Sequence, residues 1–164
     1  MERWKTIPEF PNYEVSTYGQ IRNQVADHIM ARVMNQYGVV FVGLYRRGEQ
    51  FKRSVPKLVA KAFIPNPFEA YDTPINLDGD RWNNSVDNLV WRPRWFAVRY
   101  NWEIRDGSDF HIPLPLEDIQ SKEISENSYE CARTYGLLEK DLVLSIMNRT
   151  YVWPTYQQFR VIED

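Results

Sequence analysis

The stretch from Ile75 to Trp91 decides how the rest of the chain is interpreted, and it reads INLDGDRWNNSVDNLVW. Residues 70–91 are rich in Asp, Asn and Gly and contain few residues that would form a core. Such loops usually mark a site or a turn-heavy motif, because loops held on a rigid scaffold carry much of protein function. We therefore expect the chemistry of this chain, if it has one, to lie here.

The sequence before this loop predicts strands followed by a helix. Three short segments, Trp4–Ile7, Tyr13–Ser16 and 20–22, are separated by Pro, Asn and Gly turns and predict a small β-unit. Residues 39–45 form a strong strand pattern that returns through 51–55 as a hairpin. Residues 56–63 are apolar at helical spacing and begin with proline, which suits a first helical position.

The sequence after the loop predicts an acidic linker and a pair of helices. Residues 106–126 contain two prolines and six carboxylates against one lysine. Ser128 is positioned to cap a helix through Tyr135, Gly136 breaks it, and residues 138–147 form a second helix. A short strand over 156–161 closes the chain. We expect a helix-turn-helix in this region.

Composition indicates a soluble intracellular protein. Of 164 residues, 43% are hydrophobic and 26% charged, as in ordinary globular domains. Cys131 is the one cysteine, so no internal disulfide forms and no cysteine zinc site is expected. No apolar run is long enough for a membrane span, and the N-terminus lacks the apolar stretch of a signal peptide. We expect a cytoplasmic protein with no membrane partner and no small-molecule substrate.

Charge is distributed unevenly along the chain. The net charge of −2 by itself argues weakly against a dedicated DNA-binding protein. Residues 1–64, however, carry ten Lys or Arg and five Asp or Glu, whereas residues 106–164 carry five and eleven. The first part could face phosphate groups and the last is poorly suited to them. A solvated surface with scattered charge remains an alternative.

Three segments in this order resemble the phage HNH homing endonucleases. The first covers Trp4 to Arg22 and resembles their N-terminal module of the NUMOD4 kind. The second runs from Val55 through Asn76-x-Asp78-Gly79 to Trp91 and closely resembles the HNH core. The third, Ser128 to Phe159, more loosely resembles their C-terminal helix-turn-helix module of the NUMOD1 kind. The resemblance implies an α+β chain with a β-module at 1–35, a ββα-type HNH core at 36–105, the linker at 106–126 and the helix-turn-helix at 127–164.

The resemblance also shows which catalytic residues this chain lacks. An HNH site uses a histidine to activate water and a metal ion to stabilise the leaving oxygen. The family's general base falls on Asn76, whose amide accepts no proton near neutral pH. The preceding ligand position is Ile75, the later one falls on Ala97, and another family histidine is replaced by Pro56. We therefore expect no catalytic residue and no resident cofactor.

Two carboxylates leave a metal site open as an alternative. Asp78 and Asp80 are oxygen donors close in sequence, and hard oxygen ligands suit Mg²⁺. Without a general base, such a site would bind metal more readily than it would cut. Bracing of the loop by these side chains, together with Asn83, Asn84 and Asp87, is the simpler interpretation.

Basic side chains provide candidate contacts to double-stranded DNA. They lie on the expected hairpin, on the helix after it and beyond the HNH core: Arg46, Arg47, Lys52, Arg53, Lys57, Lys61, Arg92, Arg94 and Arg99.

Aromatic residues are the other unusual feature. Trp82 lies in a polar loop, and Trp95 and Phe96 follow the motif. Those that are exposed would suit a protein partner, since Trp, Tyr and Arg dominate interface hot spots.

Three functions remain open from the sequence. The first is a non-cleaving, phage-encoded protein that binds DNA as a regulator in the host cytoplasm. The second is a factor that docks on a host or phage protein, such as a polymerase or a defence component. The third is a residual metal-dependent nickase that uses Asp78 and Asp80.

Overall fold

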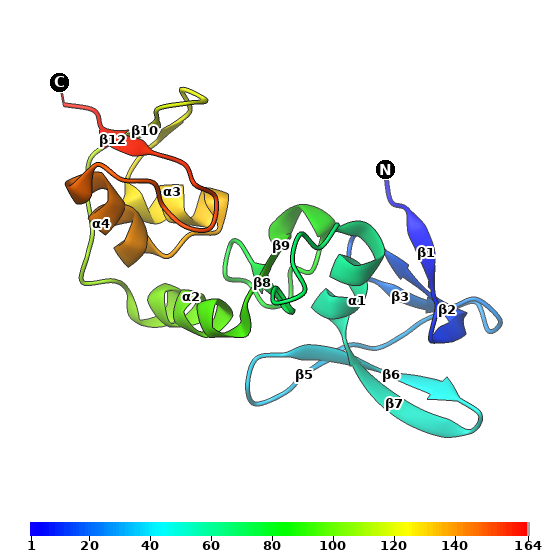
Figure 1. The fold of residues 1–164 in the computed structure, drawn as a ribbon. Coiled ribbons are helices and arrows are strands. Elements are labelled where there is room, and N and C mark those ends of the chain that lie inside the picture. Colours follow the sequence, from blue (N-terminus) through cyan, green and yellow to red (C-terminus); the bar gives the residue numbers. More distant parts are fainter. Residues whose placement is uncertain (164) are drawn as a thin grey trace. The chain divides into compact units, whose positions relative to one another are not determined.

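The structure is a computed structural model that describes residues 1–163, and the chain divides into two compact units (Figure 1). Unit 1 comprises Met1–Arg94, and unit 2 begins at Trp95. Both contain helices and small antiparallel sheets, so the predicted α+β class is confirmed. Within the described residues, no helix is long and apolar enough to cross a membrane.

The first sheet of unit 1 is an antiparallel meander in the order β1-β2-β3-β4. Its strands are β1 (Trp4–Ile7), β2 (Phe10–Ser16), β3 (Ile21–Asn23) and β4 (His28–Ile29). Trp4 pairs with Ser16, and Val15 pairs with Ile21. Phe10, Tyr13 and Val15 of β2 are buried in the core, and the neighbouring Ser16 is buried as well. The structure thus contains the predicted β-unit.

The second sheet consists of β5 (Val33–Met34), β6 (Val40–Arg46) and β7 (Glu49–Ser54), with β6 in the middle. Val40, Val42 and Leu44 point into the same core as the first sheet. Arg47 and Gly48 form the hairpin turn with φ values of 53° and 82°. Positive φ at both central residues matches the right-handed twist of the flanking strands, so the turn supports the predicted hairpin.

A helix and a second hairpin complete unit 1. Helix α1 (Val55–Phe63) is capped by Ser54, whose side chain accepts a hydrogen bond from the Lys57 backbone N–H. The loop that follows leads into β8 (Thr73–Asn76), the short 3₁₀ helix η1 (Val86–Asn88) and β9 (Leu89–Arg92). Strands β8 and β9 pair antiparallel. The acid- and amide-rich loop lies between them, and its flanking residues Ile75, Leu89 and Trp91 are buried.

Unit 2 packs helices against a three-stranded sheet. After α2 (Arg94–Asp106) come β10 (Leu116–Asp118), β11 (Ile124–Ser125), α3 (Ser128–Tyr135), α4 (Glu139–Asn148) and β12 (Phe159–Val161). The sheet order is β11-β10-β12. Its core includes Leu116, Cys131, Leu137, Leu142 and Phe159.

Two expectations for this region need correction. The segment 106–126 was expected to be a linker, but it contains β10 and β11, which pair within the sheet of unit 2. The cap of α3 is Asn127, whose side chain accepts from the Glu130 N–H, and not Ser128. Ser128 is fully buried, and its hydroxyl is satisfied there because it donates to Glu139 and accepts from the Ile112 N–H. Gly136 ends α3 in the left-handed conformation, as its position predicted.

The start of α4 is stabilised by a residue distant in sequence. Its N-cap position is Leu138, which has no side-chain capping bond. The Glu103 carboxylate on α2 accepts hydrogen bonds from the backbone N–H groups of Glu139, at 2.6 Å, and Lys140, at 3.2 Å. A carboxylate at this end also matches the helix dipole. Glu103 therefore attaches α2 to the helix pair within unit 2.

Candidate nucleic-acid interface

Asn76, which the sequence predicts to stand where related enzymes have a general base, is part of the loop's internal bracing. Its side chain is 2% exposed. The amide nitrogen donates to the Asn83 carbonyl oxygen at 2.9 Å and to the Asn84 side-chain oxygen at 3.0 Å. An amide has no basic nitrogen to take a proton from water. This arrangement favours a structural role for Asn76.

Asp78 is held in the same network by three hydrogen bonds. One carboxylate oxygen accepts from the Asp80 N–H at 2.9 Å and from the Asn88 amide at 2.8 Å. The other accepts from the Asn83 amide at 2.8 Å. Asp80 accepts from the Trp82 N–H at 2.9 Å. Over residues 1–163, no group of three or more His, Cys, Asp or Glu side chains is arranged to hold a metal ion. The contacts favour bracing, and a metal site at Asp78 and Asp80 stays an untested prediction.

The other positions where the sequence predicts a lost family residue are apolar and buried. Ile75 on β8 is 1% exposed, and Pro56 is buried in the first turn of α1. Ala97 on α2 is 4% exposed. None of these side chains has a ligating atom. In each case the position contributes to packing within its own unit.

The candidate DNA contacts fall into separate groups, and the prediction for one residue, Arg92, is wrong. Arg92 is 6% exposed and donates to the Trp91 carbonyl oxygen, so burial in β9 removes it from the surface. The exposed candidates in unit 1 lie on the β6–β7 hairpin or on α1: Arg46, Arg47, Lys52, Lys57 and Lys61. Arg53 is half-buried on β7. Arg94 and Arg99 are exposed at the start and middle of α2.

The hairpin cations do not all share one face. Strand pairing places Arg53 opposite Val42 and Lys52 opposite Gly43, so these neighbours point to opposite faces of the sheet. Arg53 and Arg46 contact Phe10 and Phe51, whereas the ammonium of Lys52 lies 5.0 Å from the ring centre of Phe41. These aromatic neighbours were missed from the sequence, because only the register of β6 with β7 brings them together.

Charge divides between the two units. Residues 1–94 carry thirteen Lys or Arg and ten Asp or Glu, a net charge of +3. Residues 95–164 carry seven and twelve, a net charge of −5. Phosphate contacts supply most of the non-specific affinity for DNA. Unit 1 is therefore the better candidate for a nucleic-acid interface.

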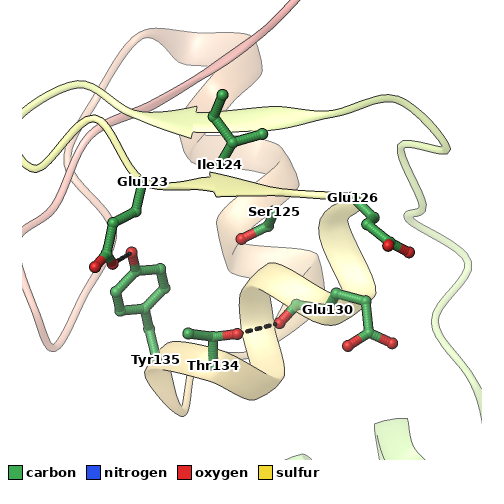
Figure 2. A pocket seen from close by; sticks show the side chains of 7 residues that line it. All are labelled: Glu123, Ile124, Ser125, Glu126, Glu130, Thr134 and Tyr135. Atoms are coloured by element: carbon green, nitrogen blue, oxygen red, sulfur yellow. Dashed lines mark hydrogen bonds between the residues drawn. The ribbon is translucent and has the colours of Figure 1, made fainter.

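Unit 2 instead has an acidic cavity of about 740 Å³ between β11 and α3 (Figure 2). The glutamates Glu123, Glu126 and Glu130 line it, together with hydroxyl-bearing residues and Ile124. The Tyr135 hydroxyl donates to Glu123 at 2.7 Å. Burial is the larger cause and this hydrogen bond the next, and together they raise the pKa of Tyr135 to about 12. Phosphate would be repelled here. The sequence analysis noted Glu123 and Glu126 but placed them in a linker, and it placed Glu130 in the helix that follows.

The three aromatic candidates for a protein partner differ in exposure. Phe96 is fully buried, so its assignment as a partner contact is wrong. Trp82 is 46% exposed and Trp95 is 50% exposed, and Trp95 stacks on Trp153 with ring centres 5.4 Å apart. Because neighbouring positions on a helix point in different directions, α2 buries Phe96 and exposes Trp95.

The fold and the sequence both indicate a class of protein. Residues 2–45 match the model of the NUMOD4 motif. Among solved structures, the HNH homing endonuclease I-HmuI, described in a study of its DNA binding and cleavage, has a similar fold, with a TM-score of 0.57. The match covers 99% of each chain at 18% sequence identity. The chain thus has an HNH-type fold.

Curated relatives carry the same description. The HNH endonuclease F-TflII of Escherichia phage T5 is 29% identical over 91 residues, which cover 55% of this chain and 47% of the relative. An uncharacterized HNH endonuclease of Acanthamoeba polyphaga mimivirus is 34% identical over 89 residues, which cover 54% and 26%. The chain thus spans less than half the length of these relatives. Together the matches support a relationship to the HNH endonucleases of phages and large viruses.

Proposed function

We propose that this chain is a non-cleaving relative of the HNH endonucleases that binds double-stranded DNA through unit 1. It would act as a regulator in the cytoplasm of a cell infected by a phage. The observation that carries the proposal is Asn76: the position of the general base holds a buried amide that donates both to Asn83 and to Asn84. A loop that is held by internal hydrogen bonds and has no general base supports the proposal that the fold is retained without hydrolytic activity.

The proposed binding surface combines the hairpin with α1. Lys57 and Lys61 are exposed and lie four residues apart on one face of the helix. Arg46 and Arg47 extend the positive charge to the hairpin turn. The family relationship favours DNA as the ligand of this surface, because a DNA endonuclease fold must hold a phosphate backbone.

Fluorescence anisotropy tests this proposal directly. A mixed-sequence DNA duplex is titrated with the full chain between 50 and 200 mM salt, with Mg²⁺ present. If about four phosphates are neutralised, the logarithm of the binding constant should fall with a slope of about −4, a loss on the order of 10²-fold over this range. The double variant Lys57→Gln and Lys61→Gln should reduce the slope by about two. No binding at low salt would refute DNA binding.

A second candidate function is docking on a host or phage protein. The half-exposed indoles of Trp82 and Trp95, and the acidic cavity of unit 2, favour it. Capture of phage or host proteins by the full chain, compared with the variant Trp82→Ala and Trp95→Ala, tests this alternative. A partner lost only by that variant would favour it. The nickase alternative has no comparable support, because the Asp78 carboxylate accepts three bonds within its own loop.

A further inference from the structure

Two arginine side chains of the hairpin share one pair of aromatic rings. The guanidinium of Arg46 lies 5.3 Å from the ring centre of Phe10 and 4.9 Å from that of Phe51. The guanidinium of Arg53 lies 5.0 Å and 5.4 Å from the same two centres. The rings themselves are 5.8 Å apart. Planar guanidinium groups stack well on aromatic faces, so both cations are held over one platform.

The backbone explains why these four side chains meet. Strand β6 pairs Leu44 with Phe51 and Val42 with Arg53, which places Phe51 and Arg53 two residues apart on the same face of the sheet. Arg46 lies two residues beyond Leu44 on that face. Phe10, at the start of β2, is 1% exposed and forms the buried side of the platform. The arrangement is therefore fixed by rigid strands.

Arg53 of this platform pairs with one exposed carboxylate. The Glu9 carboxylate lies 3.3 Å from the Arg53 guanidinium. Arg46 donates to the backbone carbonyl oxygen of Glu9 at 3.4 Å, which is near the limit for a hydrogen bond. The Glu9 carboxylate that pairs with Arg53 is 54% exposed, and Glu49, opposite Arg46 in the β6–β7 ladder, brings a second carboxylate to this end of the hairpin. An exposed ion pair of this kind is weak, so a stronger oxyanion could displace it.

We propose that Arg46 and Arg53 form a two-arginine clamp for one phosphate of a nucleic-acid backbone, and that Glu9 competes internally for it. The clamp rests on the proposed DNA-binding function, because it names one phosphate contact within that surface. Guanidinium groups bind phosphate through paired N–H donors, and stacking fixes their orientation before the ligand arrives. Glu9 occupies Arg53 in the free protein and must leave when phosphate binds.

The first test compares two variants that remove one negative charge each from unit 1. Glu9→Gln frees Arg53, whereas Glu69→Gln removes an exposed carboxylate outside the clamp. We expect Glu9→Gln to tighten binding of the DNA duplex by about three- to tenfold and Glu69→Gln by less than about twofold. Equal effects of the two variants would overturn the role of Glu9.

The second test separates charge from stacking. Arg53→Gln should weaken duplex binding and reduce the salt slope by about one, and Arg46→Gln should do the same. Arg53→Lys keeps the charge but loses the planar group, so it should recover only part of the affinity. Full recovery by lysine would overturn the clamp and leave a simple charged surface.

The third test works even if the chain binds no duplex. Inorganic phosphate is titrated into the full chain while the side-chain Nε–H signals of Arg46 and Arg53 are followed by NMR. Both signals should shift together and saturate, more tightly in Glu9→Gln, while the signal of Arg105, which pairs with Asp106, should not. Unchanged Arg46 and Arg53 signals would overturn the clamp. Saturable phosphate shifts in a chain that binds no duplex would keep the clamp but overturn its assignment to nucleic acid. The missing duplex binding would then refute the proposed function.

Discussion

Replacing Asn88 with alanine should destabilise unit 1 by about 3 kcal/mol if the loop is braced as described. The Asn88 amide nitrogen donates to Asp78 and to the Asn83 carbonyl oxygen, each at 2.8 Å. Its oxygen accepts from the Asp78 N–H at 3.1 Å. Each buried hydrogen bond that the substitution removes costs about 1 kcal/mol of stability, and the partner groups are left without that bond. Asn88 is 9% exposed, so water can replace these bonds only in part.

The assay is urea unfolding followed through the NMR signal of the Trp91 indole. Trp91 is buried in unit 1 and donates to the Ile64 carbonyl oxygen, so its signal reports on this unit. With a urea dependence of about 1–3 kcal/mol per molar, the midpoint should fall by about 1–3 M. Asp87→Ala, an exposed neighbour, should change stability by less than about 0.5 kcal/mol. An equally small effect of Asn88→Ala would refute the bracing role.

Three further predictions concern unit 2. Burial raises the pKa of the Cys131 thiol to about 11, so at pH 8 it should react with a thiol reagent only on unfolding, and rapid reaction of the native chain would contradict this. Burial raises the pKa of Asp118, but hydrogen bonds from Gln120, Gln157 and Ser121 outweigh it, so the folded pKa lies below 3.8. Its stabilising contribution is therefore present above pH 3.8 and lost as pH falls through the folded pKa, and Asp118→Asn should lower the urea midpoint at pH 7 more than at pH 3. Glu103→Ala removes the cap of α4 and should cost about 1 kcal/mol, measured by calorimetry against the exposed control Glu126→Ala.

Elements with a strong local pattern could be predicted from the sequence. The hairpin β6–β7 follows from the apolar run at 39–45 and the turn residues Arg47 and Gly48, and α1 follows from Pro56 and helical spacing. Strands β10 and β11 could not be predicted, because segments of two or three residues have no measurable period. Leu116 is buried by partners distant in sequence, since it pairs with Val161 and packs in the core with Leu142 and Phe159.

The candidate site was predictable in its composition and not in its contacts. The resemblance identified Asn76 and Asp78, but their partners depend on how the loop closes. Arg92 looked like a phosphate ligand, yet the strand β9 buries it. Likewise Glu9 became important only when the strand register placed Arg53 beside it.

The central claim is that the chain binds DNA and does not cut it, and one plasmid assay tests both parts. Supercoiled plasmid is incubated with a saturating amount of the full chain in Mg²⁺ or Mn²⁺, and each sample is run before and after the protein is removed. We predict a shifted band before removal and unchanged supercoiled plasmid after it. Sustained nicking that is lost in Asp78→Ala would contradict the claim of no cleavage, and an unshifted band would contradict the claim of binding.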